Sequence, residues 1–318
     1  MNLAILTSGG DAPGMNAAIR GFVRRGLADG HTVFGIPRGF EGLIHAEPHT
    51  MTAASVANIL MTGGTILKTS RFLDFHQVSI REMALDSLKR WQIDAVAVLG
   101  GNGSLAGANT LSESGFPIVG IPASIDNDIA GTDYSLGFDT AVNNIVSSID
   151  KIRDTASSHE RIFVVQVMGN RSGNLAIAAG LACGAEAIII PEQSSDYASI
   201  EQRLLQTYAR GKKHSFVIVA EGAGEAKTVA EELAQRTGRE AKWAVLGHTQ
   251  RGGPPTSHDR ILAALFADKA VDLLTEGKGG FMVSLCSGSI TSIPLVNVIH
   301  GQNQTLFHWQ RLAELLAR

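Results

Sequence analysis

Residues Phe116 to Asp128 read Phe-Pro-Ile-Val-Gly-Ile-Pro-Ala-Ser-Ile-Asp-Asn-Asp, an apolar run that ends in a polar loop. The run from Phe116 to Ile121 predicts a buried β-strand, because short continuous apolar stretches are typical of strands covered on both faces. Ser124, Asp126 and Asp128 follow it within one loop. In open parallel sheets, ligands bind in loops at the carboxyl ends of strands. The stretch therefore indicates a ligand site, although Asp and Asn are also common in simple turns.

Three other segments repeat the pattern of a strand, a glycine-rich loop and a helix. The glycine-rich stretch Thr7–Asn16 follows a predicted strand at Leu3–Leu6. In the same way, Gly100–Ser104 follows a strand at Ala95–Leu99, and Met168–Gly173 follows one at Ile162–Val167. Glycine lets the backbone approach a phosphate, and a helix N-terminus favours an anion. Alternating strands and helices predict an α/β protein with parallel sheets, in two similar halves that divide near residue 138.

Later elements follow the same alternation. The helix after the second glycine loop is expected to begin at Leu105. Strands are expected at Ala244–Leu246 and, as the last of the chain, at Gly280–Cys286.

Composition narrows the class of protein. The 318 residues are 44% hydrophobic and 18% charged, as in globular proteins, and the net charge of −3 gives no basic field for nucleic acid. Cys183 and Cys286 are the only cysteines, which is too few for a disulfide framework or a zinc site. No stretch reaches the roughly 18 uninterrupted apolar residues of a membrane span. The sequence predicts a soluble cytoplasmic protein.

Five cations accompany these loops: Arg71, Arg161, Arg171, Lys242 and Arg251. Phosphoryl transfer needs a phosphate cradle, a carboxylate that accepts a proton, and cations that spread the developing charge. Any one of these cations alone is more typical of a solvated surface. The first glycine loop is neither a G-x-G-x-x-G nor a P-loop sequence, which argues against dinucleotide binding and P-loop hydrolysis.

The loop at residues 7–16, with Gly100-Gly101-x-Gly103-Ser104, Ile125–Asp128, Met168-Gly169 and the Gly247–Gly253 loop, resembles the bacterial 6-phosphofructokinase family in motif order. The resemblance implies two Rossmann-like domains flanked by helices with the active site between them. It places 1–138 plus 251–301 in a nucleotide-binding domain and 139–250 plus 302–318 in a sugar-phosphate-binding domain. It also implies a homotetrameric, allosteric glycolytic kinase that uses ATP and Mg²⁺ on fructose 6-phosphate.

The family's roles can be transferred to individual residues of this sequence. Asp126 resembles the base for the sugar 1-hydroxyl, and Ser124 and Arg171 complete the catalytic set. Asn102 and Asp128 occupy the metal positions. The nucleotide positions are Gly9, Arg71, Phe72, Gly100, Gly101, Asn102, Gly103 and Ser104. The sugar-phosphate positions are Ser124, Asp126, Asp128, Met168, Gly169, Glu221, His248 and Arg251, with Arg161 and Lys242 reaching in from a neighbouring subunit.

Some positions depart from the family pattern. Asn102 replaces an Asp that helps to hold magnesium, Asn170 replaces an Arg, and Lys242 replaces another Arg. Gly103 and Ala123 match the ATP-using type, since pyrophosphate-using relatives carry an Asp and a Lys there. Two alternatives follow: a kinase for another anionic ketose or another phosphoryl donor, and a catalytically weak, sugar-phosphate-binding regulatory relative.

An effector site is also implied by the resemblance. Its cations and acid are Arg20, Arg24, Arg153, Glu186, Arg210, Lys212 and Lys213. Ala53 and Ala54 replace an Arg and a Tyr of that site, which predicts weakened effector control.

Overall fold

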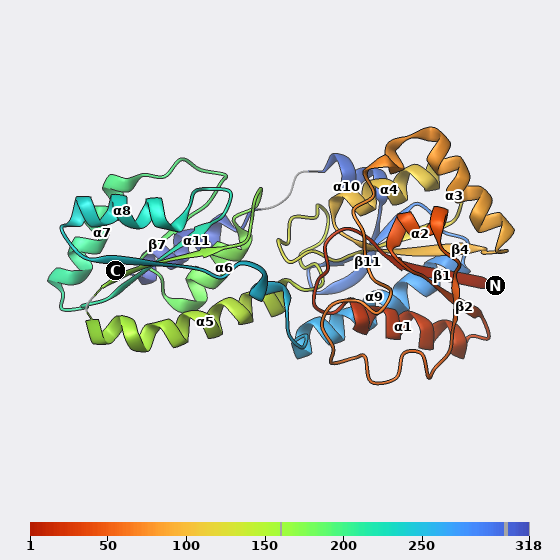
Figure 1. Cartoon of the computed structure of the whole chain (residues 1–318), viewed down its shortest axis with the longest axis horizontal. Coiled ribbons are helices and arrows are strands. Elements are labelled where there is room, and N and C mark those ends of the chain that lie inside the picture. The colour runs from red at the N-terminus through yellow and green to blue at the C-terminus, as the bar shows by residue number, and fades with distance from the viewer. Residues whose placement is uncertain (160, 302–304, 318) are drawn as a thin grey trace. The chain divides into compact units, whose positions relative to one another are not determined.

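The computed structural model describes residues 1–159, 161–301 and 305–317. The chain forms two compact units, each with its own sheet and flanking helices (Figure 1). The first comprises Met1–Ile125, Ile129–Thr140 and Arg251–Asn303, and the second comprises Asp126–Asp128, Ala141–Gln250 and Gln304–Arg318. The assignment of one ligand to each domain stays a prediction, and positions 302–304 and 318 of the expected boundaries lie outside the described residues.

The first unit contains a seven-stranded sheet in the order β11-β10-β5-β4-β1-β2-β3. Its strands are β1 (Asn2–Thr7), β2 (Thr32–Ile36), β3 (His49–Met51), β4 (Ala95–Gly100), β5 (Ile118–Pro122), β10 (Phe281–Cys286) and β11 (Ser289–Pro294). The central strands pair in parallel, as expected, and β4 and β5 are buried along their whole length.

The sheet is mixed rather than entirely parallel, because the strand pairs at both of its edges, β10–β11 and β2–β3, are antiparallel. The β10–β11 hairpin was not expected. Its two loop residues, Ser287 and Gly288, have φ values of 49° and 78°. Positive φ at both positions is what a tight two-residue hairpin turn requires. The chain therefore turns back at Ser287 and adds one more strand at the edge.

Helices cover the two faces of this sheet. They are α1 (Met15–Ala28), α2 (Gly39–His45), α3 (Val78–Arg90), α4 (Asn102–Glu113), α9 (Ser257–Thr275) and α10 (Leu295–His300), with a 3₁₀ turn at Leu73–His76. The expected start of α4 at Leu105 was wrong, because Asn102, Gly103 and Ser104 already form its first turn. The glycine loop thus ends in the helix rather than before it.

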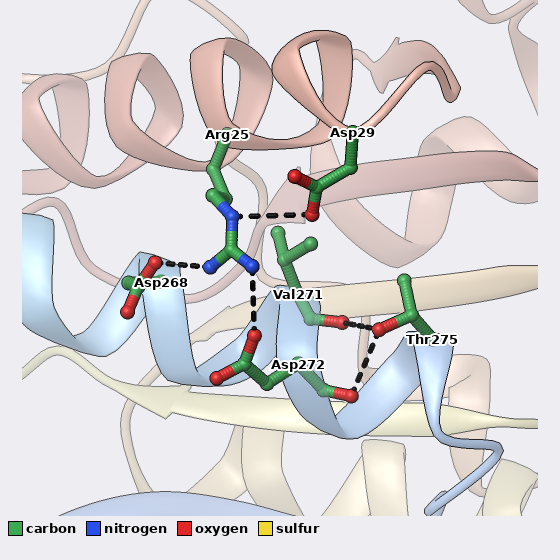
Figure 2. A network of polar contacts seen from close by, with 6 residues as sticks. All are labelled: Arg25, Asp29, Asp268, Val271, Asp272 and Thr275. Carbon is green, nitrogen blue, oxygen red and sulfur yellow. Dashed lines mark hydrogen bonds and ion pairs between the residues drawn. The ribbon is translucent and has the colours of Figure 1, made fainter.

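Arg25 of α1 joins this helix to α9 through three carboxylates (Figure 2). Its Nε lies 3.1 Å from Asp29, and its Nη2 lies 2.9 Å from Asp272, while Nη1 pairs with Asp268. The hydrogen bond to Asp29 is the main cause that raises the pKa of Arg25. One guanidinium therefore holds together three like charges from two packed helices.

We expect Arg25→Ala to lower the free energy of unfolding by about 1–2 kcal/mol, since one charged network is lost and three carboxylates are left close together. Urea denaturation of the purified protein measures the change. Lys89→Ala is the matched control, because Lys89 makes a single exposed ion pair of 3.7 Å with Asp86. Equal stability of the two variants would contradict a structural role for the Arg25 network.

The second unit contains a four-stranded sheet in the order β7-β8-β6-β9, and every pair in it is parallel. The strands are β6 (Ile162–Val167), β7 (Ala187–Ile189), β8 (Ser215–Ala220) and β9 (Ala241–Val245). The helices are α5 (Phe138–His159), α6 (Asn174–Cys183), α7 (Tyr197–Ala209), α8 (Ala226–Thr237) and α11 (Phe307–Leu316), with a 3₁₀ turn at Gly247–Arg251.

Strand β9 was expected at Ala244–Leu246 but begins three residues earlier. It is the edge strand of its sheet, and Lys242, Trp243 and Val245 are exposed along it. The apolar run Trp243–Leu246 begins two residues after the strand does and ends one residue beyond it, which is why the pattern placed the strand too late. None of the helices in the described chain is long and apolar enough to cross a bilayer.

Candidate functional site

A cavity of about 520 Å³ opens in the first unit, at the carboxyl ends of β1 and β4. Three segments line it: residues from 8–10, from 70–76 and from 101–110. The two glycine loops meet there because their strands are parallel neighbours, and Ser8 N donates to Leu99 O at 2.9 Å. The third segment is tied to the first, since Gly9 N donates to Ser70 O and Thr69 Oγ1 donates to Gly9 O.

The N-terminus of α4 forms one wall of this cavity. Gly101 precedes the helix and offers no side-chain cap, and no acidic residue lies in the first turn. The first backbone N–H groups of a helix have no partner within it and favour an anion. A Cβ added at Gly103 would meet nothing within 4 Å, so the helix start is open to the cavity. The wall is suited to phosphate groups.

An aromatic wall completes the cavity. Phe40 and Phe75 stack with ring centroids 4.2 Å apart, and Phe72 lies beside Phe75. Gly107 packs beneath them, because a Cβ there would come within 2.9 Å of the Phe40 ring. Flat apolar rings beside an anion-binding helix start suit a ligand with both a planar base and phosphates. Nothing in the strand and loop patterns had marked Phe40 or Phe75, which lie far apart in the sequence.

The predicted nucleotide residues gather in this cavity with one exception. Gly9, Arg71, Phe72, Gly101, Asn102, Gly103 and Ser104 all line it. Gly100 is the last residue of β4 and is not among the lining residues. A Cβ on Gly100 would lie 2.5 Å from the Ser104 side chain and 2.6 Å from Ser8 O. Gly100 therefore allows β4 to pack closely against Ser8 and Ser104, and it does not itself face the cavity.

The acidic loop after β5 belongs to the second unit from Asp126 to Asp128. Asp126 O accepts a hydrogen bond of 3.2 Å from Ser172 Oγ, and Asn127 O accepts one of 2.9 Å from Asn174 Nδ2. Asn127 has a φ of 48°, which Asn tolerates better than most residues. The backbone of this loop is thus fixed to the segment that follows β6. Ser124 falls in the first unit, where its carbonyl accepts from Ser135 Oγ at 2.5 Å.

Four of the ten predicted sugar-phosphate residues lie at the carboxyl ends of the second sheet. Met168 and Gly169 follow β6, Glu221 follows β8, and His248 lies just after β9. This end is tightly packed: Gly222 N donates to Gly169 O, and a Cβ on Gly222 would lie 1.9 Å from Asn170 O.

Gln250 was missed by the sequence patterns. It is fully buried, its Oε1 accepts from Met168 N at 3.1 Å, and its Nε2 donates to Gly247 O at 2.9 Å. Gln250 therefore fixes the Met168 loop against the loop that carries His248. Arg251 is placed in the first unit instead, where its Nη1 donates to Asp11 O at 2.8 Å.

Arg161 and Lys242 do not join the other sugar-phosphate residues. Arg161 directly precedes β6, and Lys242 is the second residue of β9. Both therefore lie at the amino ends of parallel strands, opposite to Met168. The six residues of β6 separate the two ends, a span of about 20 Å at about 3.3 Å per residue. Within one chain, these cations cannot contact a phosphate bound at the carboxyl ends.

The predicted effector residues are distributed over both units. Arg20 and Arg24 lie on α1, and the other five lie in the second unit. Glu186 is fully buried, pairs with Lys212 and accepts from Phe216 N at 2.7 Å. Arg153 donates to Cys183 O at 2.6 Å. Glu186 and Lys212 are thus engaged with each other in this chain.

Two α/β units with mainly parallel sheets, the first with glycine loops that line a cavity suited to anions, define a protein of the doubly wound class. The chain belongs to the phosphofructokinase family, whose model matches residues 2–274. It is 46% identical over 315 residues to the ATP-dependent 6-phosphofructokinase of Halalkalibacterium halodurans, with 99% of each chain covered. It is 49% identical over 293 residues to that of Clostridioides difficile, with 92% of each covered.

A solved structure agrees in fold. The T-state crystal structure of Pichia pastoris phosphofructokinase matches with a TM-score of 0.90 and 33% identity. The match covers all of this chain and 37% of that one, so the chain spans little more than a third of the yeast protein.

Proposed function

We propose that this protein transfers the terminal phosphoryl group of ATP to the 1-hydroxyl of fructose 6-phosphate, which gives fructose 1,6-bisphosphate, the glycolytic reaction of a 6-phosphofructokinase. The observation that supports this most strongly is family membership along almost the whole chain, together with a nucleotide-sized cavity formed by the predicted donor residues. We further infer that the enzyme works in the cytoplasm.

The donor side is supported by the cavity of the first unit. The start of α4 and Arg71 would hold the phosphates, and the Phe40, Phe72 and Phe75 rings would hold the base. A planar base distinguishes ATP from pyrophosphate, which would leave the aromatic wall unused. Gly103 also leaves the helix start open, where an acidic side chain would repel the phosphates.

The acceptor side rests on the second unit. Asp126 would take the proton from the 1-hydroxyl, and Ser124 and Arg171 would contact the transferring phosphoryl group. Met168, Gly169, Glu221 and His248 would bind the sugar at the carboxyl ends of their strands. A carboxylate that accepts the hydroxyl proton as the phosphoryl group arrives is the usual solution in kinases.

The predicted metal ligands, Asn102 and Asp128, are compatible with the way in which proteins usually bind Mg²⁺. Across residues 1–159, 161–301 and 305–317, no group of three or more His, Cys, Asp and Glu side chains could hold a metal ion. Mg²⁺ rarely needs such a cage, because it binds through one or two protein oxygens, waters and substrate phosphates. Asn102 and Asp128 would supply those oxygens. The ion would neutralise charge on the transferred group.

A homotetramer, or at least contact between copies, is supported by the position of Arg161 and Lys242. Arg161 lies about 20 Å from the carboxyl end of β6, and Lys242, which pairs with Phe163, lies about 13 Å from it. If they bind the sugar phosphate, they must bind that of a neighbouring copy.

Asn102→Asp tests whether the metal site is weakened in this chain. Asn102 is the first residue of α4 and lines the cavity. A carboxylate is a better ligand for a hard cation than an amide, and it is favourable at a helix N-terminus. We expect the variant to need about 5-fold less Mg²⁺ for half-maximal rate with ATP, since one added unit charge at about 4 Å in water contributes about 1 kcal/mol of attraction.

The alternative is that Asn102 adapts the site to another donor. In that case Asn102→Asp would bring no gain at any Mg²⁺ concentration and would lose activity with that donor. A coupled assay with ATP and pyrophosphate against several ketose phosphates separates these functions. We expect turnover with ATP and fructose 6-phosphate, and very weak turnover with every pair would favour the regulatory relative.

A further inference from the structure

Glu240 lies between the two cations at the amino ends of β6 and β9. Its Oε2 is 2.6 Å from Arg161 Nε, and its Oε1 is 2.9 Å from Lys242 Nζ. The Glu240 side chain is 49% exposed, Lys242 is 48% exposed and Arg161 is 27% exposed. Both carboxylate oxygens are therefore used by the same pair of cations, at a solvent-accessible position.

The strands themselves create this arrangement. Ile162 pairs with Ala241 in the parallel ladder, which aligns the residues before them, Arg161 and Glu240. Side chains two residues apart on a strand share a face, which places Lys242 beside Glu240. The backbone pairing is complete without the side chains, since Ile162 N donates to Glu240 O at 3.1 Å. The Glu240 carboxylate is therefore not needed to hold the two strands together.

A carboxylate and a phosphate monoester present similar oxygen anions to a guanidinium and an ammonium group. Hydrogen bonds from Lys242 and from Arg161 lower the pKa of Glu240, so it stays ionised at neutral pH. An anionic ligand that approaches these cations must replace Glu240 or share them with it. In either case it meets a fixed negative charge.

We propose that Glu240 is an internal counter-charge of the phosphate clamp formed by Arg161 and Lys242, and that it sets how tightly the clamp holds the phosphate group of the ketose substrate. The proposal rests on the proposed function, in which Arg161 and Lys242 bind the phosphate group of the sugar. Glu240 occupies both cations when no phosphate is present. When a phosphate group binds, the charge of Glu240 weakens that binding, although Glu240 does not contact the reacting atoms.

Glu240→Gln tests this, because the amide keeps the size and one acceptor but removes the charge. We expect KM for fructose 6-phosphate to fall about 3- to 10-fold at low salt, as removal of one like charge close to the phosphate predicts. The kcat value and the KM for ATP should stay unchanged. The gain should shrink at 0.5 M salt through screening, and Glu240→Asp should return KM toward the parent value.

Glu276→Gln is the matched control. Glu276 also pairs with a lysine two residues later, with its Oε2 2.8 Å from Lys278 Nζ and 51% of its side chain exposed. We expect no change in any kinetic constant there. If the parent is active but Glu240→Gln has an unchanged or raised KM for fructose 6-phosphate, the counter-charge role is wrong. The proposed function would not be contradicted by that result.

A parent protein that does not phosphorylate fructose 6-phosphate would contradict the proposed function instead. In that case, calorimetric titration with inorganic phosphate measures separately how tightly Arg161 and Lys242 bind a phosphate. Tighter phosphate binding by Glu240→Gln than by the parent would support the counter-charge role of Glu240, and equal binding would contradict it.

Discussion

Asp126→Asn is expected to lower kcat by about 100- to 10,000-fold, the usual contribution of a general base. The amide has the same shape as the carboxylate but cannot accept the hydroxyl proton. The loop should keep its conformation, because Ser172 and Asn174 hold the backbone carbonyls of residues 126 and 127 rather than the carboxylate. KM for fructose 6-phosphate should therefore change little.

Steady-state kinetics of the purified variant measure both constants. Asp86→Asn is a suitable control, since Asp86 is 78% exposed on α3 and makes only a long ion pair with Lys89. Equal turnover of Asp126→Asn and the parent would remove Asp126 from the catalytic role.

Lys242→Ala is expected to raise KM for fructose 6-phosphate about 10- to 100-fold, because hydrogen bonds to charged groups contribute about 1.5–3 kcal/mol. KM for ATP should stay within about twofold, since the predicted donor residues belong to the other unit. Lys278→Ala is the control. Lys278 forms a pair of the same spacing with Glu276 and is 58% exposed.

Two results would contradict this account. An equal rise in KM for both substrates would indicate a general loss of structure. An active monomer whose Lys242→Ala variant keeps the raised KM would contradict the contact between copies, because one chain cannot bring Lys242 to the carboxyl ends of its own sheet.

The buried parts of the fold could be predicted from the sequence. Strands such as β4 are continuous apolar runs, because helices cover both faces of a parallel sheet. The edges could not be predicted in the same way. The β9 strand exposes Lys242, Trp243 and Val245, and the β10–β11 hairpin depends on left-handed conformations at Ser287 and Gly288.

The cavity of the first unit could be predicted through its glycines and Arg71, since both glycine loops follow strands that pair in parallel. Its aromatic wall could not, because Phe40 and Phe75 meet only through tertiary packing. Glu240 escaped prediction for a similar reason. It is an ordinary acidic residue until the register of β6 and β9 places Arg161 next to it.

We propose direct phosphoryl transfer from ATP to the 1-hydroxyl of fructose 6-phosphate. Incubation with γ-³²P-labelled ATP and fructose 6-phosphate, followed by separation and ³¹P NMR of the product, tests it most directly. We expect the label in fructose 1,6-bisphosphate on the oxygen of carbon 1, in equal amount to the ADP formed. ADP formed without labelled sugar, label transferred only when another ketose is supplied, or unlabelled bisphosphate formed only when pyrophosphate is supplied, would contradict direct transfer from ATP.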